Sequence, residues 1–483
     1  RLIWPRDSLR DRDFARVKQG RLPAKLAGNH SLEAFGYRLG LMKGDYSDWC
    51  EDQGIDPWAV CRPEMVDYGV QDVQVTHALW NRIVTENYSA EAAAVEHATA
   101  WHIAQMERNG FPFNEQEAAK LYAHVVQERD ALERQLKTVF APWYVPDTTT
   151  EVVEDGDGTK RKVRTPAITH PKKTIKYKNR PWVIEGASYT KVTQVEFNPA
   201  SRDHIADRLT KLYGWKPPAF TDNGQPIVDE TTLSGLNYPA ARLLSRYLLL
   251  QKRAGQISEG NEGWLKVSRD GHVFGGVNTI GAVTRRATHM RPNIAQVPKV
   301  GSYFGAECRA LFWAGRAADG TLFVQCGADL SGIELRMLAH YMARYDGGAY
   351  AEAVVNGSSE QGTDVHSVNC RALGFDPKQV YVIAGKSAKG RDIAKTFIYA
   401  FLYGAGAAKL ASILGLPESK GAAVKKRFLA ALPALGMLIE AVQQKAKTHG
   451  YLIGLDGGRL RVRSAHSALN TLLQSAGAIV AKY

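Results

Sequence analysis

The chain has 483 residues, of which 45% are hydrophobic and 23% charged, an ordinary balance for a globular protein of roughly two to four domains. No apolar run approaches the roughly 18 residues that a membrane-spanning helix needs, and no basic-then-apolar leader follows Arg1. A formal charge of +13 suits a polyanionic partner such as nucleic acid, although many basic proteins bind none specifically.

The cysteines are odd in number and never spaced as metal ligands. The five are Cys50, Cys61, Cys308, Cys326 and Cys370. This pattern favours a reducing cytoplasm and argues against a zinc site. We therefore expect a cytoplasmic protein without a membrane anchor.

The amino-terminal part, residues 1–90, predicts a mixed α/β region. Helical stretches are expected there over 32–44 and 67–84. The alanine-rich stretch 90–110 predicts a strong helix, and 114–140 predicts another that is capped by Asn114, with Glu117 at the spacing of a capping box. We expect these two long helices to form one packed helical arm.

Residues 143–195 differ in character, being turn-rich and basic with weak apolar periodicity. The basic residues are Lys160, Arg161, Lys162, Arg164, Lys172, Lys173, Lys176, Lys178 and Arg180. We interpret this segment as a β-hairpin-like insertion at the tip of the arm. A solvated loop without a partner is the alternative.

Beyond the insertion, the chain alternates helices and strands. Helices are expected over 203–214, 237–257, 331–345, 391–406 and 422–450, the last of them broken at Pro433. A strand is expected over 320–331, and a basic strand that runs into a helix is expected over 458–483.

The expected strand 320–331 ends in an acid, Asp329, where a helix then begins. An acid at the exposed carboxyl end of a buried strand is well placed to hold a hard divalent cation, and the backbone carbonyl of Leu330 can supply another oxygen. Taken alone, Asp329 is more simply explained as a cap of the following helix.

Four polar residues recur at every fourth position along the helix that starts at Arg391. Arg391, Lys395, Tyr399 and Tyr403 form one slowly drifting stripe, because four residues turn a helix by about 400°. Two cations and two phenols make a poor core, but the cations can neutralise a triphosphate and Tyr399 can offer a flat face to a base or sugar. A solvated helix face is the alternative, and it leaves the tyrosines unexplained.

These two segments resemble motifs A and B of the family-A (Pol I-like) DNA polymerases. The motifs are DLSGIELR (329–336) and RDIAKTFIYAFLYG (391–404), and the wider sequence resembles the replicative polymerases of T-odd podophages. The resemblance spans nearly the whole chain. Supporting stretches are GAVTRRATHMRPNIAQVP, DGGRLRVRSAHSALNTLLQSAGA, NGFPF and EFNPASRDHI.

The resemblance implies roles at the catalytic centre. Asp329 resembles the first aspartate of the palm, which binds Mg²⁺ in a two-metal site. Arg391 and Lys395 resemble fingers residues that bind the triphosphate of the incoming deoxynucleotide. Tyr403 resembles the tyrosine that guards the template base, and His366 is similar to a phosphate-contacting histidine; a lone surface histidine is the alternative.

Further positions bear on specificity. Glu334 resembles the glutamate that crowds the sugar 2′ position and excludes ribonucleotides. Tyr399 stands where some relatives carry phenylalanine, and a tyrosine there is associated with poor discrimination against dideoxynucleotides. The residues that resemble minor-groove contacts to primer-template DNA, where acceptors common to all base pairs report pairing geometry, are Arg286, Asn470 and Gln474.

The amino-terminal region carries a second signature. Tyr68 and Asp72 match the Tyr-x-x-x-Asp pattern of DEDD-type 3′→5′ proofreading exonucleases, in which carboxylates such as Asp72 hold two metals and the tyrosine orients water. The spacing puts both side chains on one helix face. The pattern is also common by chance, so it gains weight only from the neighbouring sequence.

The fold class that the resemblance implies is mixed α/β, a right-hand polymerase preceded by the carboxyl-terminal part of an RNase H-like exonuclease domain. The domains expected are exonuclease 1–92, thumb 93–255 with the insertion at about 143–195, palm 256–345, fingers 346–450, and a return to the palm over 451–483. The family's further palm acid, in a His-Asp-Glu turn, does not follow Gln474, and the Asp-x-Glu strand of the exonuclease is also missing. We therefore expect a chain truncated at both ends that binds DNA but is weakly active or inactive.

Several features of the sequence allow more than one interpretation. Relatives usually have glycine where this chain has Arg285, which could add affinity for the primer backbone or displace Arg286. The insertion lies where the podophage enzymes bind thioredoxin, so a thioredoxin-like processivity factor is a candidate partner. The alternative functions are a single-subunit phage-type RNA polymerase and a non-catalytic DNA-binding protein derived from a polymerase. If a phage encodes the chain, its location is the host cytoplasm.

Overall fold

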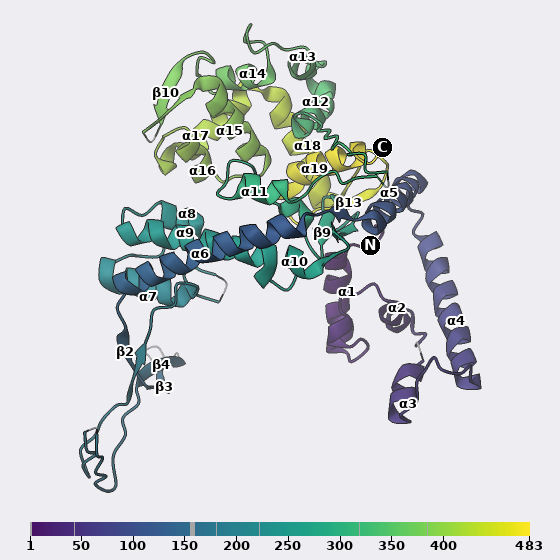
Figure 1. Cartoon of the computed structure of the whole chain (residues 1–483). Helices are drawn as coiled ribbons and strands as arrows, with labels where there is room; N and C mark the ends of the chain where they lie inside the picture. Colours follow the sequence, from purple (N-terminus) through teal and green to yellow (C-terminus); the bar gives the residue numbers. More distant parts are fainter. Residues whose placement is uncertain are drawn as a thin grey trace. The chain divides into compact units, whose positions relative to one another are not determined.

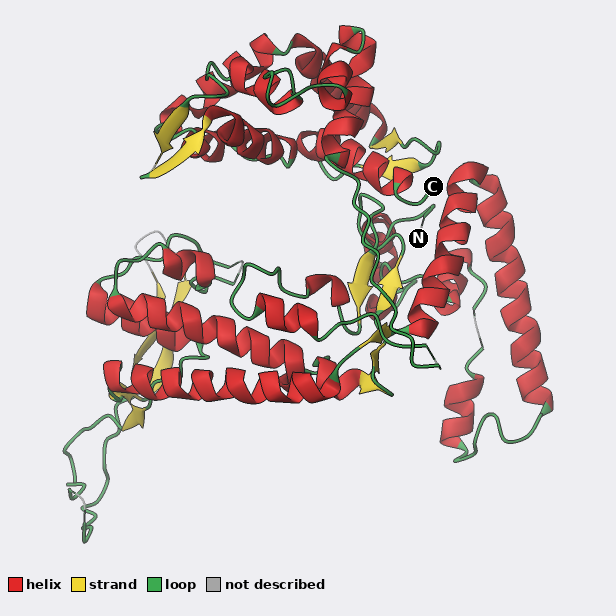
Figure 2. Cartoon of the chain, turned by 45° about the horizontal axis from the view of Figure 1, so that its top comes forward, coloured by secondary structure: helices red, strands yellow, loops and turns green. Residues whose placement is uncertain are grey.

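The computed structural model describes residues 2–42, 44–154, 160–179, 181–221, 223–317, 319–383 and 385–483 (Figure 1). They form two compact units: unit 1 comprises Arg1–Asn109, Gly276–Met290 and Cys326–Tyr483, and unit 2 comprises Gly110–Gly275 and Arg291–Gln325. Both units are mainly helical, with short strands (Figure 2). The two units cut across the five predicted domains, whose boundaries stay a prediction. Across the described residues, no helix is both long and apolar enough to cross a membrane.

The amino-terminal part of unit 1 is helical. It consists of α1 (Arg6–Lys18), the 3-10 turn η1 (Ala24–Leu26), α2 (Leu32–Leu39), α3 (Tyr46–Asp52) and α4 (Pro63–Thr85). The prediction of a mixed α/β region is therefore wrong for the described residues of 1–90. Val75, Leu79 and Ile83 follow one another at four-residue spacing and turn inward from α4, which is helical rather than strand periodicity. The predicted stretch 32–44 includes Lys43, which lies outside the described residues.

Helix α5 (Ala90–Asn109) ends before Gly110, as predicted, where the backbone turns left-handed with φ +65°. It belongs to unit 1, where it packs beside strand β8 (Gly276–Asn278), and Glu107 Oε1 accepts a hydrogen bond of 2.5 Å from the Val277 amide. The prediction that α5 forms one arm with the next long helix is therefore wrong, because tertiary contacts assign the two helices to different units.

Helix α6 (Glu115–Val139) packs along α9 (Pro239–Ala254) in unit 2. Asn114 caps α6 as predicted, because its side chain accepts the Glu117 amide at 3.1 Å. The Glu117 side chain is within 2.7 Å of Lys120 Nζ, so the geometry is that of a simple cap with an ion pair on the helix surface.

The insertion is a β-ribbon, which confirms the hairpin-like prediction. Strand β2 (Trp143–Pro146) pairs with β5 (Val192–Val195), and β3 (Thr148–Glu154) pairs with β4 (Lys160–Pro166), both antiparallel. The ribbon projects from the part of unit 2 that contains α6 and α7 (Arg202–Tyr213) (Figures 1 and 2). Residues 155–159 and Arg180 lie outside the described residues.

The rest of unit 2 surrounds two apolar clusters, one centred on Phe113, Trp264 and Phe312 and the other on Phe140 and Phe197. Its further elements are α8 (Glu230–Ser234), the π-turn η2 (Gly255–Glu259), α10 (Trp264–Val267), the 3-10 turn η3 (Ile294–Gln296), α11 (Gly305–Ala310), and a three-stranded sheet of β1 (Phe111–Pro112), β7 (His272–Val273) and β6 (Ser268–Arg269).

The carboxyl-terminal part of unit 1 is a helical body with three short hairpins. Its helices are α12 (Ile333–Asp346), α13 (Ala349–Val355), α14 (Val365–Ala372), α15 (Gly390–Leu402), α16 (Ala407–Ile413), α17 (Gly421–Ala431), α18 (Pro433–His449) and α19 (Ala468–Val480), with 3-10 turns η4 (Glu418–Lys420) and η5 (Ala465–Ser467). The hairpins are β8 with β9 (Thr288–Met290), β10 (Val380–Ile383) with β11 (Lys386–Lys389), and β12 (Tyr451–Ile453) with β13 (Arg459–Arg461). The predicted break at Pro433 is confirmed.

The predicted strand over 320–331 is absent from the structure. Only an isolated bridge between Arg316 and Leu322 is formed, and Val324 is 89% exposed, so the expectation of a buried strand is wrong. A strand is stable only when a neighbour satisfies its backbone hydrogen bonds. The Phe323 amide donates to the Gly315 carbonyl at 3.1 Å, but among the described residues no strand pairs with 324–330.

Candidate active site

Helix α15 presents two faces of different chemistry. The buried face carries Ile393, Ala394, Phe397, Ile398, Phe401 and Leu402. On the opposite side, Lys395 and Tyr403 are exposed, whereas Arg391 and Tyr399 are half-buried. Tyr403 is the C-cap residue, one position beyond the helix. The stripe therefore lies off the buried face of α15, although Tyr399 packs partly against the core.

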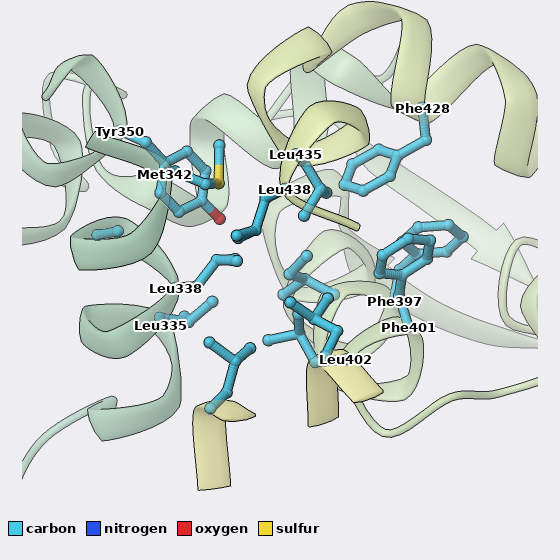
Figure 3. Packing of buried hydrophobic residues seen from close by; sticks show 14 of the residues in the cluster. Leu335, Leu338, Met342, Tyr350, Phe397, Phe401, Leu402, Phe428, Leu435 and Leu438 are labelled. Carbon is cyan, nitrogen blue, oxygen red and sulfur yellow. The ribbon is translucent and has the colours of Figure 1, made fainter. Parts of the chain in front are cut away.

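A shared apolar core holds α15 beside α12. Figure 3 shows Phe397 and Phe401 of α15 next to Phe428 of α17, while Leu335 and Leu338 of α12 enter the same cluster. The ring centroids of Phe397 and Phe428 are 5.1 Å apart in an edge-to-face arrangement, one of the preferred geometries of aromatic pairs. This packing fixes where the polar side chains of α12 and α15 point.

Arg391 is held by a carboxylate that the sequence analysis missed. Asp364 caps α14 by accepting the His366 amide at 3.1 Å, and it lies 2.9 Å from Arg391 Nη2. Burial opposes ionisation of Asp364, but hydrogen bonds from Arg391 and Ser367 outweigh it and hold its pKa below the ordinary value. An aspartate just before a helix was the available signal, and it indicated the cap but not the ion pair.

His366 lies beside the stripe, and its role as a phosphate contact stays a prediction. Its ring centroid is 6.3 Å from that of Tyr399. Burial lowers the pKa of His366, and the positive charge of Arg391 lowers it further. The imidazole is therefore neutral at neutral pH, so it can donate one N–H to an anion but brings no charge.

Glu334 joins Arg286 to the stripe. Its Oε1 is 2.6 Å from Arg286 Nη2 and accepts a hydrogen bond of 3.2 Å from the Tyr403 hydroxyl. Burial raises the pKa of Tyr399 and of Tyr403, and the negative charge of Glu334 adds to the rise in both. One carboxylate therefore contacts groups from the β8–β9 connection and from the end of α15.

Asp329 opens onto a cleft of about 550 Å³ within unit 1. Arg286 and Lys482 also line this cleft, together with Ile333 and small residues of α19. Asp329 is the one acidic residue among the described lining residues. It does not cap α12, since the N-cap residue is Gly332 without a side-chain hydrogen bond, so the simpler explanation of Asp329 is not supported.

The predicted Mg²⁺ ligands, Asp329 and the Leu330 carbonyl, have donor atoms of the kind that this ion binds. The Asp329 carboxylate and the Leu330 carbonyl are hard oxygen donors of the kind that Mg²⁺ prefers. Among the described residues, no group of three or more His, Cys, Asp and Glu side chains could hold a metal ion. The Mg²⁺ site at Asp329 and Leu330 stays a prediction.

Two of the three predicted DNA contacts, Arg286 and Gln474, line different clefts of unit 1. Asn470 and Gln474 are spaced by four residues on α19 and are half-buried, whereas every other residue from Ala468 to Ile479 is buried. Gln474 lines a second cleft of unit 1, about 600 Å³ in volume, whereas Arg286 lines the cleft of Asp329. The predicted role of Asn470 and Gln474 as minor-groove contacts stays a prediction.

Arg285 is buried, which contradicts both alternatives considered for it. It is 6% exposed and ion-paired with Asp456 at 2.5 Å, so it is not available to a primer backbone. It also does not displace Arg286, which points to Glu334. The reason is the buried acid of the β12–β13 turn, a partner 171 positions away that no local pattern indicates.

The exonuclease signature has the geometry of a shared face. Tyr68 and Asp72 both lie on α4 and are half-buried, and the Tyr68 ring is 5.8 Å from that of Tyr46. The predicted metal-binding role of Asp72 stays a prediction.

Comparison with known proteins gives the family. Residues 172–482 match the family described as DNA polymerase family A. The chain is 39% identical to the DNA-directed DNA polymerase of Enterobacteria phage T3 over 98% of this chain and 74% of that protein. The values for the DNA-directed DNA polymerase of Escherichia phage T7 are again 39%, 98% and 74%. The chain belongs to DNA polymerase family A, and within it to the branch represented by these phage enzymes.

A solved structure supports the same fold. The POL domain of Pol1 from M. smegmatis, in complex with DNA primer-template and dNTP, matches with a TM-score of 0.61 over 94% of this chain and 67% of that chain. Its sequence identity is 17%, so this likeness bears on the fold alone. The family match confirms the predicted resemblance and sets aside the RNA polymerase alternative.

Proposed function

We propose that this chain is a template-directed DNA polymerase that adds deoxynucleotides to a primer 3′ end. The observation that carries the proposal is the arrangement in unit 1, where the polar stripe of α15, Glu334 and the Asp329 cleft meet. Membership in DNA polymerase family A supports it. The partners proposed are primer-template DNA and deoxynucleoside triphosphates.

The nucleotide side of the site binds the triphosphate by charge. Arg391 and Lys395 lie one helical turn apart on the open face of α15, and each contributes a positive charge to the anionic phosphates. Asp364 keeps Arg391 in place while leaving part of its guanidinium exposed. Neutral His366 donates a hydrogen bond, and the Tyr399 ring offers a face to the base or sugar.

Glu334 is proposed to select the sugar. Arg286 and Tyr403 both contact its Oε1 atom, so the carboxylate cannot swing away without breaking both contacts. A rigid group at the sugar 2′ position excludes a hydroxyl by crowding it, which a mobile side chain does less well. We propose that Tyr399 lets the site accept dideoxynucleotides with little discrimination against them.

Family membership implies a divalent metal, and we propose Mg²⁺ bound by Asp329 and the Leu330 carbonyl together with the triphosphate. When bound, such an ion neutralises phosphate charge and stabilises the attacking and leaving oxygens. Two-metal transfer needs a second carboxylate, and Asp329 is the one acid among the described lining residues of its cleft.

The test separates binding from chemistry. A primer-template with a dideoxy-terminated primer is mixed with the protein, and the complex is measured by fluorescence anisotropy with each of the four deoxynucleotides. Only the nucleotide complementary to the template is expected to stabilise the complex. Lys395→Ala should weaken this effect by about 10- to 100-fold, as for the removal of a hydrogen bond to a charged group.

The matched control is Lys409→Ala, which removes one exposed positive charge from neighbouring α16. It should leave the nucleotide effect unchanged. DNA binding without any effect of the complementary nucleotide would favour the second candidate, a non-catalytic DNA-binding protein. Template-directed primer extension with Mg²⁺ by the unmodified chain would refute that second candidate.

Two further proposals concern partners and proofreading. The insertion carries exposed Trp182 and Ile184 beside its cations, and Lys176 lies 4.7 Å from the Trp182 ring centroid. Such a surface suits duplex DNA or a thioredoxin-like processivity factor. Tyr68 and Asp72 are proposed as remnants of a 3′→5′ exonuclease site.

A further inference from the structure

Residues 279–287 connect β8 to β9, and this loop carries two consecutive arginines, Arg285 and Arg286, whose side chains point in different directions. Arg286 is partly exposed and contacts Glu334 in the candidate active site. Arg285 turns inward, where its guanidinium donates to the two carboxylate oxygens of Asp456 at 2.8 and 2.5 Å and lies 3.4 Å from Glu96. The buried arginine is thus covalently next to a residue of the site.

The backbone at Arg285 has a conformation that favours glycine. Its φ is +62°, in the left-handed region. The Arg285 amide donates to the Ala282 carbonyl at 2.9 Å, and the Ala282 amide donates to the Arg286 carbonyl at 3.1 Å. When the last residue of a tight turn adopts the left-handed backbone conformation, that residue is normally glycine. An arginine is tolerated at this position only if contacts with its surroundings hold it in that conformation.

The surroundings of Arg285 are shaped for its guanidinium. Asp456 is fully buried, and its Oδ1 also accepts the Gly458 amide at 3.0 Å. A Cβ atom on Gly458 would lie 2.6 Å from Arg285 Nη1, so a side chain there would collide with the ion pair. The β12–β13 turn therefore both supplies the acid and leaves the space.

A second cation fixes the backbone between the two arginines. Lys482 Nζ donates to the Arg285 carbonyl at 3.1 Å and to Glu96 Oε1 at 2.5 Å. The Arg285 carbonyl and the Arg286 amide belong to one planar peptide unit, so holding the carbonyl sets the orientation from which Arg286 starts. The next carbonyl, that of Arg286, is held by Ala282. Both peptide units that flank Arg286 are therefore restrained.

We propose that Arg285 is a positioning residue that anchors the β8–β9 loop to Asp456 and Glu96 and thereby presents Arg286 to the primer end beside Glu334. The inference rests on the proposed function, with Arg286 as one of the predicted minor-groove contacts to the primer-template. The buried cluster has two cations, Arg285 and Lys482, and two anions, so its formal charges balance. Loss of Arg285 alone would leave Asp456 buried without its partner.

A purely structural role for the ion pair makes a different prediction. If Arg285 only stabilised the fold, any change that restored stability would also restore DNA recognition. The double variant Arg285→Gly/Asp456→Asn separates the two roles. It removes both charges, so no buried charge is left unpaired, and glycine relieves the backbone at 285. The side-chain link from residue 285 to Asp456 and Glu96 is lost, and Lys482 alone of the buried cluster still holds the carbonyl of residue 285.

The experiment measures three properties of the full chain, its Arg285→Gly/Asp456→Asn variant and Arg285→Lys. They are thermal stability, amide hydrogen exchange of residues 279–287, and the preference for a matched over a mismatched primer terminus in the complex with the complementary nucleotide. Leu209→Ala, in the core of unit 2, is the control for destabilisation away from the loop. Arg285→Lys keeps the charge and serves if the double variant fails to fold.

For the double variant we expect near-normal stability, faster exchange in the loop, and a matched-to-mismatched preference reduced about tenfold, within the usual range of coupling between sites. Arg285→Lys should fall between the two, because an ammonium cannot contact Asp456 and Glu96 with a rigid fork. Normal exchange and normal preference in the double variant would overturn the inference, as would an equal loss of preference in Leu209→Ala. If the unmodified chain forms no nucleotide-dependent complex, the proposed function fails. Amide hydrogen exchange of residues 279–287 needs no DNA, so it still decides whether Arg285 anchors the loop.

Discussion

Replacement of Glu334 by alanine should weaken both the selection of the sugar and the order of the site. In the structure, the Glu334 carboxylate accepts from Arg286 at 2.6 Å and from the Tyr403 hydroxyl at 3.2 Å. Alanine removes both contacts and opens space where the sugar 2′ position is proposed to lie. We therefore expect ribonucleotides to compete much better in Glu334→Ala than in the unmodified chain.

The magnitudes follow from the surroundings of Glu334. The Arg286 side chain is 41% exposed, so solvent screens the ion pair, and its loss should cost about 0.2–1 kcal/mol of unfolding free energy. Loss of the Tyr403 hydrogen bond adds roughly 1 kcal/mol. Relief of crowding by a few heavy atoms is worth about 1–3 kcal/mol, so deoxy-over-ribo preference should fall by about 10- to 200-fold.

The assay is a competition between the complementary deoxynucleotide and ribonucleotide for the complex with a dideoxy-terminated primer-template. Glu334→Gln is the matched control, because glutamine keeps the volume and loses the charge. Glu334→Gln should retain most of the preference, whereas Glu334→Ala loses it. An unchanged preference in Glu334→Ala would refute crowding by Glu334, and an equal loss in both variants would assign selection to charge instead.

Three further predictions concern other parts of the site. Tyr399→Phe should raise the preference for deoxynucleotides over dideoxynucleotides. The preference is measured by competition between the two nucleotides for the complex with an unblocked primer-template. Strong discrimination both in the unmodified chain and in Tyr399→Phe would contradict the role of Tyr399. The pKa of Asp364 lies below its ordinary value of 3.8. Its contribution to stability is therefore complete above pH 3.8 and is lost as the pH falls through the lower pKa of the folded state. Urea unfolding from about pH 6 to about pH 2 should show a smaller loss of stability in Asp364→Asn than in the unmodified chain. Because Pro146 pairs with Val192, residues 147–191 can be replaced by a two-residue turn. This deletion should lower the affinity for DNA, and it should reduce the salt dependence of DNA binding by about one unit of slope for each phosphate that the ribbon no longer neutralises. A pull-down with thioredoxin tests the protein partner.

Much of the helical framework of this polymerase-family chain could be predicted from the sequence. The end of α5 before Gly110, the Asn114 cap of α6 and the break at Pro433 all depend on residues within one or two turns of each other. The stripe of α15 was equally predictable, because its period and its contrast with the aliphatic face are properties of one helix.

The prediction of a buried strand ending at Asp329 failed for the opposite reason. Apolar residues such as Phe323 and Val324 favour a strand, but a strand also needs a neighbour to satisfy its backbone, and that is decided by distant parts of the chain. The assignment of α5 and α6 to one arm failed in the same way, since each helix was predicted correctly and only its packing partners were not.

The sequence by itself determined the family, the helices and the polar stripe, because local periodicity, capping and motif spacing depend on neighbouring residues. Only the tertiary structure decided how these residues are held. Asp364 restrains Arg391, Glu334 joins Arg286 to Tyr403, and Arg285 is buried against Asp456. Each of these pairs joins segments far apart in sequence, and a charged side chain becomes an anchor or an open ligand site only according to which partner the fold brings within hydrogen-bond distance.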